Sequence, residues 1–374
     1  ETGVRKLGAK VFYVRDEWVK ISYPGELFEP GNMPQILSSI AGNVFGMKSV
    51  ASLRLQDIKW PRKLIKSFLG PRLGIEGIRK LTGVKKRPLI GTIVKPKVGL
   101  HASKHAQVAY DAWMGGVDIV KDDENLSNMG FNKFDDRIIK TLSMASKAET
   151  KTGEKKIYMP NVTAETDEMI RRTKFVKKHR GTHVMVDIMT VGWAGFQTLR
   201  ITTEKLGLAL HAHRAGHAAI DKGDNGISMA VLASIARIIG ADQLHIGTVV
   251  GKMSGSREDE MMIKAKTADR DNKAFWNPGA LDQDWFGTIP VFPVCSGGLH
   301  PGHVPALVHI FGNDIIIQAG GGVHGHPDGT TAGATALRQA SEAVADGIEL
   351  KDFAKNKAEL KKAIDKWGVA HIWD

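Results

Sequence analysis

The chain has 374 residues, of which 42% are hydrophobic and 25% are charged, so it is long enough for one large domain and a smaller one with separate cores. No apolar run approaches the roughly 18 residues that span a membrane, and the single Cys295 permits no internal disulfide, so we expect a cytoplasmic protein with no membrane partner. The net charge of +12 suits a small polyanionic substrate, whereas the basic runs lack the interleaved aromatic residues of a nucleic-acid reader, so we expect no nucleic-acid partner.

From residue 87 onward, apolar strand patterns alternate with amphipathic helical patterns. The predicted strands are 88–95, 117–121, 156–161, 183–189, 208–213, 243–249, 289–295 and 314–319. The predicted helices are 102–115, 134–151, 166–179, 196–206, 227–240, 256–268, 301–311 and 330–346. Eight strand and helix units in roughly 260 residues indicate an α/β fold, a (β/α)8 TIM barrel, whose functional residues lie at the carboxyl ends of its strands.

The second predicted strand ends in a lysine and three carboxylates, Lys121, Asp122, Asp123 and Glu124. Alternation sends Lys121 and Asp123 to one side of the strand and Asp122 to the other. Carboxylate oxygens suit Mg²⁺, but the ammonium of Lys121 repels a cation. This lysine therefore either neutralises the cluster or is chemically converted into a metal ligand. Taken alone, the cluster fits a solvated, charge-balanced loop better than a functional site.

Five other predicted strand ends also carry polar or glycine-rich segments. They are Lys95 to Lys97, His211 to Arg214, His245 to Lys252, Ser296 to Gly298 and Gly320 to Gly322. Each one alone is more often a solvated lysine, a core histidine or a turn. Together they predict two anion sites that flank one metal centre, with glycine-rich backbone holding one anion and Arg214, His245 and Ser296 holding the other.

These motifs resemble the large subunit of ribulose-1,5-bisphosphate carboxylase/oxygenase, RuBisCO. The resemblance covers essentially the whole chain, and its segments are Gly42–Gly46, Gly91–Leu100, Gly115–Asn125, His211–Arg214 and Gly247–Lys252. Phe131 to Phe134 and Met253 favour the archaeal type III or the II/III group. The implied domains are the remainder of an α+β amino-terminal domain at 1–60, a connecting segment at 61–86, the catalytic barrel at 87–350 and a helical tail at 351–374.

The resemblance implies carboxylation of ribulose 1,5-bisphosphate with CO₂, and competing oxygenation with O₂, to 3-phosphoglycerate through a Mg²⁺-stabilised enediolate. An activating CO₂ would convert Lys121 to a carbamate, which would hold Mg²⁺ together with Asp123 and Glu124. The carbamate would start enolisation, and Lys95 would protonate later intermediates. The resemblance further implies that His213 contacts substrate hydroxyls and shares proton handling, and that Lys252 stabilises the incoming carboxylate.

The substrate-binding residues that the resemblance implies are Asn43, Lys97, Arg214, His245, Ser296, Gly297, Gly320 and Gly321. Lys97 would tune Lys95, and Gly320 and Gly321 would bind one phosphate. Asn43 lies in the small domain, so the family's shared site implies at least a homodimer, or a larger assembly of dimers.

Two features depart from the family pattern. Ser254 stands where the family usually has an acidic residue. The first residue falls well inside the amino-terminal domain, so we expect a trimmed or processed chain, with a naturally shortened or split enzyme as the alternative. Two alternatives remain: a RuBisCO-like enolase or isomerase of sulfur salvage, and a catalytically dead phosphate-binding or assembly protein. The first alternative is disfavoured because the chain retains Lys95, Lys252, His245 and Ser296.

Overall fold

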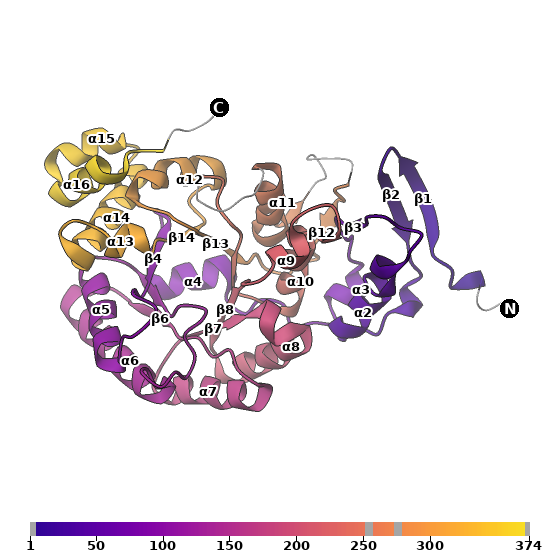
Figure 1. Ribbon diagram of the computed structural model, residues 1–374, viewed down its shortest axis with the longest axis horizontal. Helices are drawn as coiled ribbons and strands as arrows, with labels where there is room; N and C mark the ends of the chain where they lie inside the picture. The colour runs from indigo at the N-terminus through magenta and orange to yellow at the C-terminus, as the bar shows by residue number, and fades with distance from the viewer. Residues whose placement is uncertain (1–4, 251–256, 273–278, 371–374) are drawn as a thin grey trace.

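The computed structural model describes residues 5–250, 257–272 and 279–370, which form a small amino-terminal unit beside a barrel (Figure 1). The small unit begins with a hairpin and continues through short helices. Its elements are β1 (Lys10–Arg15), β2 (Trp18–Ser22), η1 (Gly25–Leu27), α2 (Met33–Ile40), η2 (Asn43–Gly46), β3 (Arg54–Leu55) and α3 (Arg62–Ile65). Asn32 starts α2 by accepting a hydrogen bond from the backbone N–H of Gln35, a common helix cap.

Eight parallel strands form the barrel, in the order β6, β5, β4, β14, β13, β10, β8 and β7. Backbone bonds on both sides of Met185 close it between β6 and β7, since Met185 N donates to Pro160 O at 2.8 Å and Val162 N donates to Met185 O at 2.9 Å. The strands are β4 (Leu89–Ile93), β5 (Ile119–Lys121), β6 (Ile157–Met159), β7 (His183–Asp187), β8 (Ala209–His213), β10 (Gln243–His245), β13 (Phe292–Ser296) and β14 (Ile316–Gln318). The predicted TIM barrel is confirmed.

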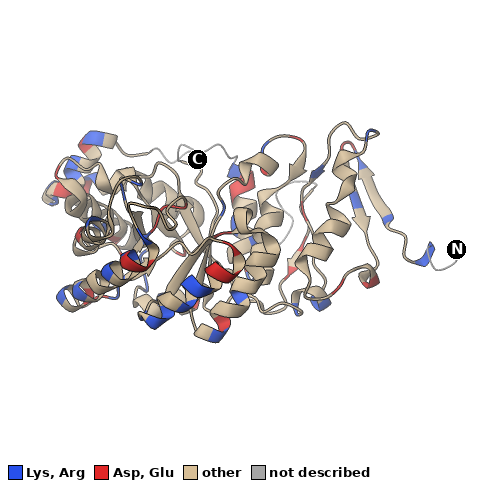
Figure 2. Cartoon of the chain, turned by 60° about the horizontal axis from the view of Figure 1, so that its bottom comes forward, with Lys and Arg blue, Asp and Glu red and all other residues tan. Residues whose placement is uncertain are grey.

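Helices surround the strands, as Figure 1 shows. The main outer helices are α5 (Ala102–Met114), α6 (Phe134–Thr152), α7 (Thr166–Lys178), α8 (Ile188–Leu206), α10 (Met229–Ile239), α11 (Arg257–Ala268), α12 (Val304–Phe311) and α14 (Gly329–Ala345). The shorter elements are α9 (Ala218–Asp221), β9 (Gly226–Ile227), β11 (Asp271–Asn272), β12 (Gln283–Asp284), η3 (Pro301–His303), α13 (Gly321–His324), α15 (Leu350–Phe353), η4 (Ala354–Asn356) and α16 (Ala358–Trp367). Both signs of charge occur on the outer helices (Figure 2).

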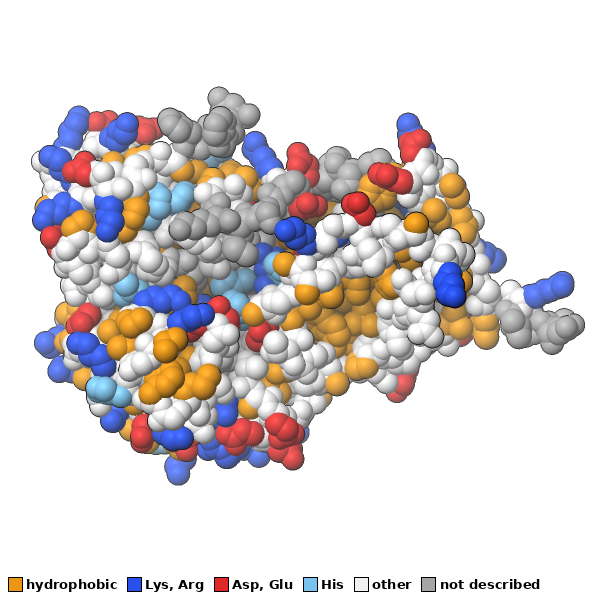
Figure 3. Space-filling model, viewed as in Figure 1, with side chains coloured by type: hydrophobic (Ala, Val, Ile, Leu, Met, Phe, Trp, Pro, Cys, Tyr) orange, Lys and Arg blue, Asp and Glu red, His pale blue; other side chains and the backbone are white. Residues whose placement is uncertain are grey.

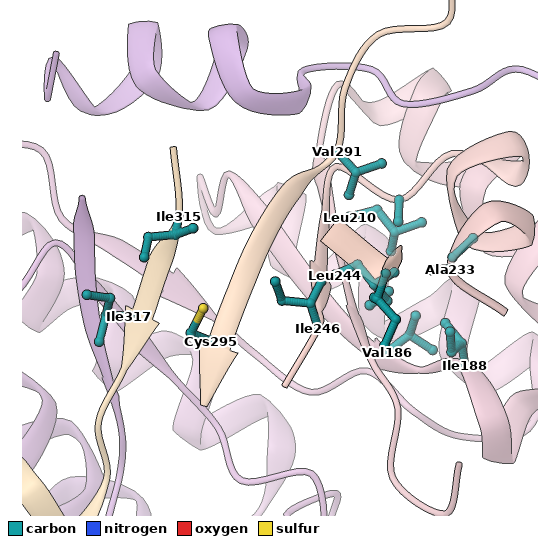
Figure 4. Close-up of a cluster of buried hydrophobic side chains, with 14 of the residues drawn as sticks. Val186, Ile188, Leu210, Ala233, Leu244, Ile246, Val291, Cys295, Ile315 and Ile317 are labelled. Carbon is teal, nitrogen blue, oxygen red and sulfur yellow. The ribbon is translucent and has the colours of Figure 1, made fainter. Parts of the chain in front are cut away.

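The strands are buried on both faces, which explains their nearly continuous apolar sequences. One set of side chains packs outward against the helices, including Leu210, Leu244 and Ile246 (Figure 4). The alternate set fills the barrel, where Leu89 and Phe292 pack with one another and with other inward residues. Helix α4 (Gly74–Thr82) covers the amino-terminal end, since its Ile78 belongs to that inner cluster. The interior is therefore apolar at one end and leaves the other end for polar groups.

One helix differs from its predicted range. We expected a helix only over 196–206, but α8 already begins at Ile188, where the preceding Asp187 caps it by accepting from Met189 N. Gly192 has a φ of 70° and kinks the helix, so the first turns do not continue the helical periodicity of residues 196–206. The predicted helix at 301–311 is likewise divided into η3 and α12. No described helix is long and apolar enough to cross a membrane.

Candidate functional site

The polar side chains gather at the carboxyl ends of the strands, opposite α4, where barrel enzymes hold their active sites. Histidine and basic side chains lie around the centre of the face in Figure 3. Lys121, at the end of β5, is only 1% exposed. Its Nζ donates to the carbonyl oxygen of Asp122 at 2.9 Å and lies 3.4 Å from Met185 Sδ and 3.9 Å from Glu124 Oε2. Burial lowers the pKa of Lys121, although the charges of Glu124 and Asp123 raise it. At a given pH a larger fraction of Lys121 is therefore the neutral, nucleophilic amine.

The three carboxylates that follow Lys121 point in different directions, as alternation predicts. Asp122 points away from Lys121, toward the outer helices, where it accepts from Arg137 Nε at 3.1 Å and from the Tyr158 hydroxyl at 2.6 Å. It is fully buried and paired, so it anchors the strand end to α6 and β6. Asp122 therefore does not belong to the group of side chains around Lys121.

Asp123 and Glu124 point toward side chains that follow or end other strands of the barrel. Asp123 Oδ2 lies 2.6 Å from Lys95 Nζ, and this pair joins the ends of β4 and β5. Although burial raises the pKa of Asp123, the hydrogen bond from Lys95 leaves it below its ordinary value. Glu124 Oε2 lies 3.7 Å from His213 Nε2, at the end of β8. Lys95, Lys121, Asp123, Glu124 and His213 thus form one cluster, which we call the charged corner.

The charged corner fits a divalent cation only if Lys121 changes its chemistry. Among the described residues, no three His, Cys, Asp or Glu side chains gather as a ready metal site. Asp123 and Glu124 supply two carboxylates, and the third neighbouring group is the lysine. A carbamate on Lys121 would supply the missing anionic oxygen, so the donors that are present fit Mg²⁺ with this modification.

A second polar cluster lies at the ends of β8, β10 and β13. His245 is 3% exposed, and its Nδ1 lies 2.7 Å from Ser296 Oγ while its Nε2 lies 2.9 Å from His211 Nε2. The ring of His213 is 4.7 Å from that of His245, so this cluster adjoins the charged corner. Arg214 follows directly on β8, and burial lowers its pKa to about 10 even though Glu260 raises it. Arg214, His245 and Ser296 are thus together in one region, as expected for an anion site.

The glycine-rich ends of β13 and β14 lie beside these clusters. Gly320 precedes α13, and a Cβ built on it would lie 3.6 Å from Lys95 Cε, so this backbone is close to the charged corner. Gly321 is exposed and Gly297 is half-buried. A cavity of about 500 Å³ opens next to Gly321 and is also lined by Gly298, His300, His303 and Trp367.

Two predicted site residues are not joined to the two clusters among the described residues, and a third lies outside those residues. Asn43 is exposed in η2 of the small unit, and within the described ranges no hydrogen bond or ion pair connects it to the barrel mouth. Lys97 is exposed beyond β4. Lys252 lies outside the described residues, as do Met253 and Ser254.

Two buried carboxylates near the clusters were not predicted. Asp187 ends β7, and burial raises its pKa to about 6 with a further contribution from Glu124. It was missed because the predicted strand ran over 183–189, which placed Asp187 inside the strand, whereas β7 ends at Asp187 and α8 begins at Ile188. Burial also raises the pKa of Glu260 in α11 to about 7, although Arg214 lowers it. Glu260 was missed because a carboxylate in the first turn of a helix is common.

Comparisons with known proteins agree on one family. A model described as ribulose bisphosphate carboxylase large chain, catalytic domain, matches residues 74–367, and its N-terminal domain counterpart matches residues 1–64. The ribulose bisphosphate carboxylase of Methanosarcina mazei is 54% identical over 366 residues, covering 97% of this chain and 86% of that protein. The corresponding protein of Methanocaldococcus jannaschii is 53% identical over 356 residues, covering 93% and 82%.

Two solved structures share this architecture. The dimeric archaeal Rubisco from Hyperthermus butylicus has a TM-score of 0.94 and 41% identity, covering 99% of this chain and 87% of that chain. The octameric Rubisco from Pyrococcus horikoshii, in complex with sulfate ion, has a TM-score of 0.90 and 44% identity, covering 98% and 84%.

Proposed function

This chain belongs to the family of ribulose bisphosphate carboxylase large chains, and we propose that the charged corner is where it carboxylates and oxygenates ribulose 1,5-bisphosphate to 3-phosphoglycerate. The chain is a ribulose bisphosphate carboxylase of the archaeal type. The observation that carries the site assignment is Lys121, a buried lysine at the end of β5 whose Nζ lies 3.9 Å from Glu124 Oε2 and within the electrostatic influence of Asp123. Burial disfavours the ammonium of Lys121, whose ion pair with Glu124 is long at 3.9 Å, whereas its free amine is a nucleophile for CO₂.

The first step is modification of Lys121. The ammonium first loses one proton to solvent. The neutral amine then attacks the carbon of an activating CO₂, a nitrogen–carbon bond forms as one carbon–oxygen π bond opens, and the nitrogen gives up a second proton to solvent. Two protons therefore leave as the cationic side chain becomes an anionic carbamate. Lys121, Asp123 and Glu124 would then hold Mg²⁺, which when bound polarises the sugar oxygens and stabilises the negative charge that develops on them. The carbamate would accept the proton that is removed from the sugar in enolisation.

Other residues of the mouth handle protons and bind the substrate. Lys95 Nζ, held at 2.6 Å from Asp123 and partly exposed, is the proposed proton donor to later intermediates, with Lys97 tuning it. His213 faces Glu124 and is proposed to contact substrate hydroxyls. Lys252 keeps its predicted role at the incoming carboxylate.

The two phosphates of the substrate are assigned to opposite sides of the charged corner. Arg214, His245 and Ser296 would hold one through their side chains. The backbone of Gly297, Gly320 and Gly321 would hold the other.

We propose that the working unit is at least a homodimer, in which Asn43 of one chain completes the barrel-mouth site of the other. Asn43 is exposed in the small unit, and the related Rubisco proteins of known structure are dimeric or octameric. The predicted domain limits, at 1–60, 61–86, 87–350 and 351–374, are retained as proposals, as is the cytoplasmic location.

A lysine substitution tests the assignment. Lys121→Met should abolish carboxylation, whereas incubation of the unmodified protein with bicarbonate and Mg²⁺ should raise it. Lys156→Met is the matched control, because Lys156 is also fully buried but pairs with Glu154 at 2.8 Å, away from the mouth. Near-normal carboxylation by Lys121→Met would contradict the site assignment. If the protein without any substitution bound the bisphosphate but showed no turnover after activation, the catalytically dead alternative would be favoured.

A further inference from the structure

A buried chain of hydrogen bonds runs from Ser296 at the barrel mouth to Gln243 inside the barrel. Ser296 Oγ lies 2.7 Å from His245 Nδ1, His245 Nε2 lies 2.9 Å from His211 Nε2, and His211 Nδ1 lies 2.8 Å from Gln243 Oε1. Gln243 and His211 are completely buried. We call these four residues the relay. Every ring nitrogen in the relay has one partner, so the hydrogen position in one bond determines the next.

The strand register aligns the relay. Gln243 is paired with His211 across β10 and β8, and His245 is paired with Val294, two residues before Ser296 on β13. Leu244, between Gln243 and His245, and Ile246, which follows His245, point outward into the helix layer (Figure 4). The relay residues therefore stack from the interior to the mouth along one side of the barrel.

The direction of the relay is set by which residue of each hydrogen-bonded pair is the donor. It follows from the Gln243 oxygen, which only accepts hydrogen bonds. His211 must then carry its proton on Nδ1, and it is neutral because burial lowers its pKa to about 3. Its Nε2 accepts a hydrogen bond from His245 Nε2, which leaves the neutral His245 to accept from the Ser296 hydroxyl through Nδ1. In this direction the Ser296 hydrogen points into the protein, and only oxygen lone pairs face the mouth.

Ser296 can donate a hydrogen bond to an anion at the mouth only when the relay runs in the opposite direction, since phosphate oxygens accept hydrogen bonds. Protonating His245 would be one route, but its surroundings oppose a positive charge. Burial lowers its pKa well below the ordinary value, and His213, His211, Lys121 and Arg214 lower it further. The charged groups that face the relay from β5 and β8 thus favour a neutral route.

The amide of Gln243 offers that neutral route. Its Nε2 is buried and has no hydrogen-bond partner within the described part of the chain. Turning the amide by half a rotation keeps its shape and sacrifices no hydrogen bond made by Nε2. It places an N–H donor on His211 Nδ1, so His211 donates through Nε2, His245 donates through Nδ1, and the Ser296 hydrogen is free to point outward. Both directions contain the same number of protons, and each histidine only changes tautomer.

We propose that Gln243 is a positioning residue whose amide orientation sets the direction of the relay and thereby allows Ser296 to donate to a substrate phosphate. This inference rests on the proposed function, in which Ser296 contacts a phosphate. The proposal about Gln243 adds that an unprotonated anion binds at Ser296 without net uptake of a proton by the protein.

Gln243→Glu tests the proposal, with sulfate as the probe because sulfate carries no titrating proton at neutral pH. A protonated carboxyl donates to His211 at low pH, whereas an ionised carboxylate only accepts. The sulfate dissociation constant of this variant should therefore rise up to about tenfold per pH unit above the carboxyl pKa, with uptake of one proton per sulfate bound. Calorimetry in buffers of different ionisation enthalpy measures that uptake. The unmodified protein should show none, and a full proton taken up by it would overturn the proposal.

Two control variants separate the relay from simple charge repulsion. Gln283→Glu places the same charge at another buried glutamine, one that bonds to the Trp60 backbone and not to the relay, and its sulfate affinity should lack the proton-linked pH dependence. Adding Ser296→Ala to Gln243→Glu should remove the step, because no hydroxyl remains to be redirected. Persistence of the step in the double variant would refute the relay. Unchanged sulfate affinity in Ser296→Ala alone would instead reject the phosphate assignment of the proposed function.

A measurement on the unmodified protein covers the case in which Gln243→Glu does not fold. Nitrogen-15 NMR of labelled histidines distinguishes protonated from unprotonated ring nitrogens. We expect His211 Nδ1 to be protonated without sulfate and unprotonated with saturating sulfate. The signal is assigned from its loss in His211→Asn. An unchanged His211 tautomer on sulfate binding would contradict the proposal.

Discussion

The charged corner and the relay lie side by side at the barrel mouth, yet they bury polar groups in different ways. In the charged corner, Lys95 and Asp123 compensate each other at 2.6 Å, while Lys121 lies near Glu124 at 3.9 Å. In the relay, burial keeps His211 and His245 neutral, and hydrogen bonds satisfy them. Removing one charge therefore leaves another uncompensated, whereas removing one relay group mainly redirects its neighbours. The charged corner should thus be the more sensitive of the two.

Glu124→Gln should have the largest effect, a loss of carboxylation of at least about 1000-fold, because it removes both a proposed metal ligand and the nearest carboxylate to Lys121. The measurement is the carboxylation rate at saturating bicarbonate and Mg²⁺. Glu154→Gln is the control, since Glu154 pairs with Lys156 and Arg338 outside the mouth. If Glu124→Gln kept more than about a tenth of the activity, the charged corner would not be the reaction centre.

Ser296→Ala should have a smaller effect that appears mainly in substrate binding. Loss of one hydrogen bond to a charged phosphate predicts a rise in KM of about 10- to 100-fold, with a smaller change in kcat. Steady-state kinetics with ribulose 1,5-bisphosphate measures both constants. Ser341→Ala is the control, because Ser341 is buried but bonds to the backbone of Arg338. An effect confined to kcat would instead place Ser296 in the chemistry.

Activation of the charged corner should depend on pH through the Lys121 amine. Burial lowers the pKa of Lys121, with Glu124 opposing, and only the deprotonated amine reacts with CO₂. At constant dissolved CO₂ the activation rate should rise up to about tenfold per pH unit and level off below the ordinary lysine value of about 10.4. The test is the initial rate of activation measured across pH. A rise that continues through that value would show an unshifted lysine.

Glu260, beside Arg214, should produce the smallest effect, one on stability. Burial raises its pKa to about 7, although Arg214 lowers it, so the folded state holds this proton more tightly than the unfolded state. The stability that this tighter proton binding contributes to the folded state is fully present below the unfolded-state pKa of about 4.5. It is lost as pH rises through the folded-state pKa of about 7. Glu260→Gln should therefore gain about 1 kcal/mol over the unmodified protein above pH 7, and nothing at low pH. Urea unfolding of both proteins below pH 4.5 and above pH 7 measures the difference in the free energy of unfolding. A difference that is the same at both pH values would contradict this prediction.

The sequence by itself determined the barrel and the placement of Lys121, because both depend on short-range patterns. A buried strand was expected over 117–121, and β5 ends at Lys121. The alternation of side chains along a strand then sent Asp122 outward to Arg137 and Asp123 inward to Lys95. The (β/α)8 arrangement brings all eight strand ends to one mouth, so the candidate residues of β4, β5, β8, β10, β13 and β14 were recognised from their positions.

Only the tertiary structure decided which of the remaining polar residues meet. The relay joins Gln243 to His211, 32 positions apart, and this contact depends on the register between β10 and β8, which no local pattern specifies. Asp187 acquires its raised pKa from burial beside Glu124, a property of the assembled mouth. Periodicity identifies which face of a strand is buried, but the neighbour across the sheet is chosen by long-range packing.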